Sequence, residues 1–219
     1  VFKPVDDFFV HRLLVERGTV KTGDRVTIAV DRRLRRGTAQ HHTATHLLHR
    51  ALKEVLGEHA NQAGSLVAPD RLRFDFTHYQ ALSAEELARV EDLVNAKVAE
   101  DLPVEAFYTT LEEAKKMGAI ALFGEKYGAR VRVVRIGDFS MELCGGTHLS
   151  RTGGVGIFKI TAEIGIGAGV RRIEAVAGES ARRYLNGQEQ QLQEAARLLK
   201  TSPREVLPRL RELLHVVEE

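Results

Sequence analysis

Two pairs of metal-capable side chains have the same spacing in this sequence. His42 and His46 stand four residues apart, and Cys144 and His148 repeat that spacing further along the chain. Residues four apart on a helix project from one face, so the two histidines can present their imidazoles to one ion. Zinc in proteins is usually held by four nitrogen and sulfur ligands in a tetrahedron. The sequence therefore predicts that the fold brings His42, His46, Cys144 and His148 together around one zinc ion.

The sequence leaves open whether these four residues bind zinc and, if they do, whether the zinc is catalytic or structural. Two histidines at this spacing are by themselves more often surface or core residues than ligands. A metalloprotease motif requires glutamate directly after the first histidine as general base, and this chain has Thr43 there. A structural zinc stays open, because four protein ligands leave no free coordination position. Catalysis at such an ion would require one ligand to be absent, to be displaced by substrate, or to be joined by a fifth.

The composition indicates a globular protein of a reducing compartment. The 219 residues are 43% hydrophobic and 28% charged, which is enough to bury a sizeable core. The single cysteine excludes a disulfide within the chain and every site that needs two thiolates, and it favours a cytoplasmic location. The N-terminal residues contain no signal-peptide core, and no apolar run of about 18 residues predicts a membrane span or a membrane partner.

The net charge of +2 is too small to indicate a nucleic acid partner by itself. Arginines are nevertheless clustered at 32–36, 171–172 and 182–183. Such clusters can bind phosphates, although a solvated face is the favoured interpretation for each of them.

Alternating apolar residues predict a β-rich N-terminal segment. Val26, Ile28 and Val30 alternate with polar residues after the turn at Gly23-Asp24, a pattern typical of a strand with one buried face. The segment 1–36 is therefore interpreted as a small β-barrel-like part.

The rest of the chain mixes helical and strand patterns. A helix is predicted over about 38–56, with Gly57 as its stop. Capping-box sequences at Ser83 and Thr110 predict two more helices. Strands are expected within 62–76 as a pair, and over 104–108, 131–136, 139–143, 155–164 and 170–176.

These patterns predict an α+β fold in three parts, namely the segment 1–36, a zinc-containing α/β domain over 37–179, and a helical pair over 180–219. In the last part, Leu185, Leu192 and Leu199 recur at seven-residue intervals. This periodicity favours a helical hairpin or coiled-coil seam, which is the candidate surface for self-association.

Two loops have chemistry that the sequence alone does not decide. The stretch from Gly165 to Arg172 could offer backbone amides and arginine to a phosphate, and a hairpin turn explains it equally well. The stretch from Phe123 to Tyr127 could be a substrate loop, although an ordinary surface turn is favoured by its composition.

Four motifs occur in an order that resembles a known family. They are His42-Thr43-Ala44-Thr45-His46-Leu47-Leu48, Leu122-Phe123-Gly124-Glu125-Lys126-Tyr127, Cys144-Gly145-Gly146-Thr147-His148 and Gly169-Val170-Arg171-Arg172-Ile173-Glu174. Together they resemble the editing region of alanyl-tRNA synthetase and its free-standing relatives, the AlaX proteins. The resemblance extends over about 5–180, and the helical tail is similar to the segment that follows this region in the bacterial synthetase.

The resemblance implies a fold, a reaction and a set of residues. The implied fold is an α/β editing domain of the alanyl/threonyl-tRNA synthetase type, preceded by a small β-barrel. The implied reaction is hydrolysis of the ester that joins serine or glycine, attached in error, to the 3′ end of tRNA for alanine. Position 41 is commonly asparagine in this family and is histidine here, which removes no ligand. The resemblance assigns the zinc ligands to His42, His46, Cys144 and His148.

The resemblance also assigns residues to the substrate. Thr45 is similar to a threonine that recognises the serine hydroxyl, Gln62 to a glutamine of the editing pocket, and Arg171 to an arginine near the terminal nucleotide. Thr45, Gln62 and Cys144 are accordingly the candidate catalytic residues. Two other interpretations stay open, namely that Thr45 is a buried helix threonine and that Gln62 is a hydrogen-bonding residue at a strand start.

The competing function is a structural, zinc-containing module that binds tRNA without hydrolysing it. Aminoacylation by these residues alone is not expected, because none of them would supply an adenylate-forming domain.

Overall fold

A computed structural model describes residues 2–5, 8–121 and 128–218. The chain consists of two compact units, Val1–Asp31 and Arg32–Glu219. The described part of the first unit contains one antiparallel pair, β1 (Phe2–Val5) and β2 (Phe8–Val10). The predicted division at 36/37 lies near the observed one, and the three-part division of the chain stays a prediction.

The prediction of a strand around Val26, Ile28 and Val30 is wrong. No strand occurs between residues 11 and 31, and these three side chains are 60%, 69% and 56% exposed. A strand needs a neighbour that binds its backbone N–H and C=O groups, and in the described part of this unit only β1 and β2 pair. Alternation indicates which face a strand would bury, but it does not supply the pairing partner, and the β-barrel-like interpretation is not confirmed.

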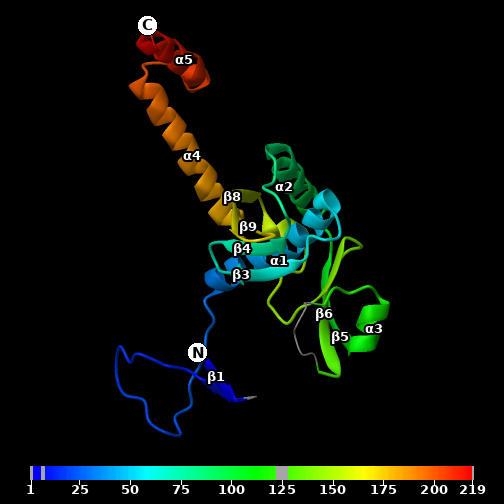
Figure 1. Cartoon of the computed structure of the whole chain (residues 1–219). Helices are drawn as coiled ribbons and strands as arrows, with labels where there is room; N and C mark the ends of the chain where they lie inside the picture. Colours follow the sequence, from blue (N-terminus) through cyan, green and yellow to red (C-terminus); the bar gives the residue numbers. More distant parts are fainter. Residues whose placement is uncertain (1, 6–7, 122–127, 219) are drawn as a thin grey trace. The chain divides into compact units, whose positions relative to one another are not determined.

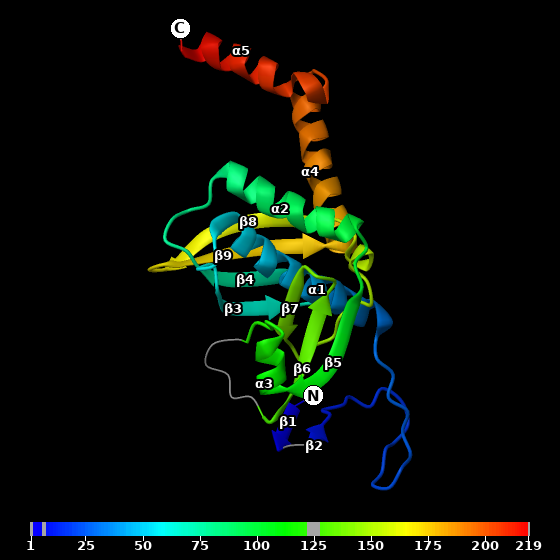
Figure 2. The same ribbon diagram turned by 90° about the vertical axis from the view of Figure 1, so that its right-hand side faces the viewer.

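The second unit is α+β, as predicted, and Figures 1 and 2 show its helices and strands. Its strands form two antiparallel sheets. The four-stranded sheet has the order β3-β4-β9-β8, and the three-stranded sheet the order β5-β6-β7. The strands are β3 (Gln62–Val67), β4 (Leu72–Thr77), β5 (Val104–Thr110), β6 (Arg130–Ile136), β7 (Ser140–Leu143), β8 (Phe158–Gly167) and β9 (Val170–Ala177).

Two long helices cover one face of the four-stranded sheet (Figure 2). Phe74 of β4 and Ile173 of β9 lie in one buried core cluster with side chains of α1 (Arg32–Leu56) and α2 (Ala84–Ala99). The buried contributions of the two helices include Leu47, Leu48 and Leu52 from α1 and Val90, Val94 and Val98 from α2. A smaller apolar cluster lies between the three-stranded sheet and α3 (Leu111–Lys116). Both predicted capping boxes are present, at Ser83 and Thr110.

Helix α1 begins at Arg32, earlier than the predicted start near Thr38, and it ends before Gly57 as predicted. The start could not be predicted from the sequence because glycine, here Gly37, is unfavourable inside a helix. The structure explains that glycine: a Cβ there would lie 2.3 Å from the carbonyl oxygen of Pro69. The backbone of α1 therefore lies against the turn between β3 and β4, and only glycine allows this approach.

Replacing Gly37 with alanine is expected to destabilise the fold by about 1–3 kcal/mol, because the atom it meets belongs to backbone that cannot turn aside. Gly187 is the matched control, since it also lies inside a helix and a Cβ there meets nothing within 4 Å. Gly187→Ala should raise stability by about 0.5–1 kcal/mol through helix propensity alone. Urea unfolding of both variants checks the pair, and equal shifts would contradict the close packing at Pro69.

The C-terminal part forms two helices, α4 (Gly178–Leu198) and α5 (Val206–Glu218), which confirms the helical pair. Of the three leucines of the predicted seam, Leu192 is exposed, whereas Leu185 and Leu199 are half-buried. Two short 3-10 segments, Thr152–Val155 and Pro203–Glu205, complete the described elements. None of the described helices is both long and apolar enough to cross a membrane.

Candidate metal centre

The four predicted ligands lie together. His42 and His46 project from α1, Cys144 follows β7 directly, and His148 lies in the loop after it. The Sγ atom of Cys144 lies 3.3 Å from Nε2 of His42 and 3.3 Å from Nε2 of His148. One ligand atom from each of the four residues lies within 4.8 Å of every other. The pairing inferred from the spacing of the motifs is therefore present in the fold.

The donor set and its dimensions fit zinc. For Zn–S near 2.3 Å and Zn–N near 2.0–2.1 Å, a tetrahedron places sulfur and nitrogen about 3.5 Å apart, close to the two 3.3 Å separations. Nε2 of His46 is buried and has no hydrogen-bond partner in the described part of the chain. Burying such an atom unpaired is costly, and a metal ion would satisfy it.

The loop after β7 is held by Arg132 of β6. Its Nη1 donates hydrogen bonds to the carbonyl oxygens of Cys144 and Gly146, each at 2.8 Å. The backbone N–H of Cys144 in turn donates to the carbonyl oxygen of Arg132. These bonds fix the backbone that carries two of the four ligands.

Burial and neighbouring charges set the protonation of the loop ligands. Burial alone would raise the pKa of the Cys144 thiol, but hydrogen bonds from His148 and His42, together with the charge of His46, lower it to about 3. Burial lowers the pKa of His148 to about 4, although its hydrogen bond to Cys144 acts in the opposite direction. At neutral pH the cysteine is therefore a thiolate and His148 is neutral, and these are the forms that bind metal.

Glu142 is a functional residue that the sequence reasoning missed. Its carboxylate is buried, with Oε2 2.9 Å from Nδ1 of His46 and Oε1 3.1 Å from Nδ1 of His49. Burial alone would raise the pKa of this carboxyl, but the charge of His46 and the hydrogen bond from His49 lower it well below its usual range. For His46, burial alone would lower the pKa, but the nearby charges of Glu142 and Cys144 raise it to about 10. A carboxylate behind a ligating histidine typically fixes the orientation of that ligand.

Thr43 supports a second ligand. Its hydroxyl lies 3.3 Å from Nδ1 of His148 and accepts a hydrogen bond from the backbone N–H of Leu149 at 3.2 Å. The residue that argued against a protease motif therefore orients the ring of His148, which leaves Nε2 toward Cys144.

His41 does not take part in this group. Its Nδ1 donates to the carbonyl oxygen of Gly37 at 2.8 Å, and its Nε2 accepts from the backbone N–H of Ala177 at 3.0 Å. Burial lowers the pKa of His41, which favours the neutral ring that these two bonds require. The histidine at this position thus ties α1 to the end of β9.

A cavity of about 510 Å³ contains one of the predicted substrate residues. It is lined by His49, Asn61, Gln62, Ala63, Thr77, Ile120 and Ala121. Gln62 stands at the start of β3 and donates to the hydroxyl of Ser65 at 3.3 Å. Thr45 is not among these lining residues; it is buried, and its hydroxyl donates to the carbonyl oxygen of His41 at 2.8 Å. That contact is the one expected of a buried helix threonine.

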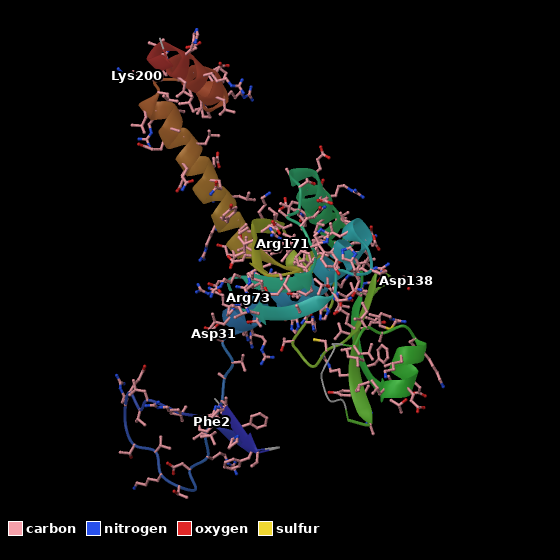
Figure 3. The ribbon with its side chains drawn as sticks, viewed as in Figure 1. Phe2, Asp31, Arg73, Asp138, Arg171 and Lys200 are labelled. Carbon is pink, nitrogen blue, oxygen red and sulfur yellow. The ribbon has the colours of Figure 1, made fainter. Side chains whose placement is uncertain are left out.

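Arg171 lies on β9, beside the strand that carries Arg73, and both are labelled in Figure 3. Its guanidinium forms a bidentate pair with the Glu163 carboxylate, and the second bond, from Nη2, is 2.7 Å long. The hydrogen bond to Glu163 raises the pKa of Arg171 above its ordinary value. The glycine-rich stretch before it forms the β8–β9 hairpin, with Gly169 in a left-handed conformation at φ +69°. The interpretation of the stretch from Gly165 to Arg172 as a hairpin turn is therefore confirmed.

The motif from Leu122 to Tyr127, which includes the candidate substrate loop, lies outside the described residues.

Comparison with known proteins agrees with the sequence motifs. The threonyl and alanyl tRNA synthetase second additional domain matches residues 131–174, a stretch that includes Cys144 and His148. The alanine–tRNA ligase of Pelotomaculum thermopropionicum is 60% identical over 219 residues, which is 100% of this chain and 25% of that protein. The alanine–tRNA ligase of Geobacillus kaustophilus is 60% identical over 96% of this chain and 24% of its own length.

A similar match is found in Listeria monocytogenes, where the alanine–tRNA ligase is 55% identical over 93% of this chain and 23% of its own length. The chain thus spans about a quarter of the length of the curated relatives it matches. These matches confirm the resemblance drawn from the four motifs: residues 131–174 match the second additional domain, and the whole chain is similar to a part of alanine–tRNA ligases.

Proposed function

We propose that this segment hydrolyses the ester that joins serine or glycine to the 3′ end of tRNA for alanine. The observation that carries the proposal is the group of His42, His46, Cys144 and His148 in a chain that contains the second additional domain. A pocket sized for alanine cannot exclude glycine by bulk, and it excludes serine only weakly because one extra hydroxyl costs little. A second, hydrolytic site is the usual remedy in synthetases.

In this proposal the chain's own residues bind and orient the ester. Gln62 contacts the aminoacyl group in the cavity, and Thr45 uses the acceptor side of its hydroxyl, since its hydrogen is given to His41. Arg171 binds the terminal nucleotide, for which its guanidinium must share or leave Glu163. Zinc held by His42, His46, Cys144 and His148 would polarise the ester carbonyl or hold the substrate's amino group.

The competing proposal is a structural metal in a module that binds tRNA without hydrolysis. It is favoured by one observation, the presence of four protein ligands, because a tetrahedral site with four ligands has no open position. Zinc as an organiser of the pocket is compatible with both proposals, whereas zinc as the source of hydroxide requires a ligand to leave.

Deacylation by the purified chain is expected, with zinc bound, on tRNA for alanine that carries serine or glycine. Removal of the metal by a chelator should greatly lower the rate, and readdition of zinc should restore it. The assay measures release of the amino acid under single-turnover conditions, with alanine-charged tRNA as the control substrate. Retention of tRNA binding with no hydrolysis above the spontaneous rate would support the structural module.

A further inference from the structure

The Glu142 carboxylate is shared by two imidazoles of α1. His46 and His49 both turn Nδ1 toward it, at 2.9 Å and 3.1 Å. In each ring Nε2 lies on the edge away from Glu142. For His46 that edge faces the metal-ligand group. His49 belongs to no such group, so its Nε2 has no function in the site described above.

The hydrogen on His49 can be assigned from its partner. An ionised carboxylate only accepts hydrogen bonds, so Nδ1 of His49 carries the hydrogen and Nε2 retains a lone pair. Nε2 is buried and has no hydrogen-bond partner in the described part of the chain, and the whole residue is 1% exposed. Leaving a buried acceptor unpaired is costly. The arrangement is therefore suited to a bound group that donates a hydrogen.

His49 also lines the cavity that contains Gln62. Ile120, another lining residue, pairs with Glu142 along β7, so the cavity lies beside the shared carboxylate. The side chains of Asn61 and Thr77 hydrogen-bond within the protein, to Lys53 and His59. Among the described lining residues His49 is the one with a buried ring nitrogen that has no hydrogen-bond partner.

We propose that His49 is a catalytic residue of the hydrolysis proposed above, on which this inference rests. Nε2 of His49 accepts a hydrogen bond from a water molecule in the cavity and takes its proton while the water oxygen attacks the ester carbonyl carbon. The new C–O bond gives a tetrahedral intermediate. The bond to the ribose oxygen then breaks, and that oxygen receives the proton from Nε2. One ester and one water thus become one free amino acid and one 3′ hydroxyl.

Glu142 is a positioning residue in this step. It fixes the His49 ring through the contact at Nδ1, which leaves Nε2 on the opposite edge for the water, and it stabilises the positive charge that the ring acquires. Because Glu142 also touches the ligand His46, a variant of Glu142 would change both histidines. The test is therefore made on His49.

The decisive variant is His49→Gln in the zinc-loaded chain. Its amide can still donate to Glu142 and accept a hydrogen bond from water, but it cannot take a proton. The single-turnover rate on serine-charged tRNA for alanine should fall about 10²–10⁴-fold, while zinc content and tRNA affinity stay unchanged. His78→Gln is the matched control, because His78 is also buried with an unpaired Nε2 but does not line the cavity. That control should keep the wild-type rate.

A second variant, His49→Ala, tests proton transfer directly. Imidazole added to the solution should restore part of its rate by entering the space that the ring has left. A wild-type rate in His49→Gln would overturn the proposal, and so would loss of zinc in parallel with loss of rate, or failure of imidazole to restore the folded alanine variant. In the wild-type chain, ¹⁵N NMR should place the His49 hydrogen on Nδ1, and a hydrogen on Nε2 would also overturn it. An inactive wild-type chain, by contrast, identifies failure of the proposed hydrolysis itself.

Discussion

Cys144→Ala is expected to remove both metal binding and deacylation while the fold remains. Cys144 is the sole thiolate of the group, and its Sγ contacts the ligand atoms of His42 and His148. Loss of an outer contact that merely orients a ligand costs about 10–100-fold in metal affinity, so loss of the thiolate itself should reach at least the upper end of that range. The residue belongs to neither apolar cluster, and therefore the sheets and helices do not depend on it.

Zinc content by mass spectrometry, far-ultraviolet circular dichroism and the single-turnover rate measure the three parts of this expectation. Chelated wild-type protein is the control, because it lacks the metal but retains the thiol. A variant that loses its secondary structure would indicate that the metal holds the fold together. A variant that loses zinc and keeps its rate would show that hydrolysis does not need the ion.

Gly146→Ala is expected to lower zinc affinity by at least about 100-fold with little change in stability. A Cβ at this position would lie 2.0 Å from Cε1 and 2.4 Å from Nδ1 of His42. The ring stands at the end of a flexible side chain and can turn away at small cost to the fold. Once turned, its Nε2 no longer lies beside the sulfur of Cys144.

The neighbouring glycine supplies the matched control. A Cβ at Gly145 meets nothing within 4 Å, and its φ lies outside the left-handed region. Gly145→Ala should therefore bind zinc as the wild type does, in the same loop and one residue away. Competition titration with a zinc-binding dye measures both affinities, and equal values would show that the loop adjusts to the added methyl group.

The elements that depend on local pattern could be predicted from the sequence. The capping boxes at Ser83 and Thr110 formed because each needs only residues within one helical turn. The two ligand pairs also have local spacings, and four donors of the types that zinc prefers made their meeting a reasonable expectation. The strands from β3 to β9 follow apolar runs that are long enough to be recognised.

Features that depend on distant partners could not be predicted. Glu142 stands in a short strand where a carboxylate would usually face solvent, and only the two histidines of α1 make its burial tolerable. The start of α1 was missed because the reason for Gly37 lies at Pro69, in another part of the chain. The strand expected around Ile28 failed because no neighbour in the described chain pairs with it. In each case the deciding contact is absent from the local pattern.

The buried Glu142 has a consequence for the total charge of the metal centre. Zinc contributes two positive charges, and the Cys144 thiolate and the Glu142 carboxylate contribute one negative charge each, while His42, His46 and His148 are neutral when they act as ligands. The filled centre, with its supporting carboxylate, is therefore electrically neutral in a part of the protein where unbalanced charge is costly. If the proposed hydrolysis occurs, a neutral centre exerts no net long-range attraction on the carboxylate of the amino acid product. The same carboxylate that orients His46 would thus favour departure of the product.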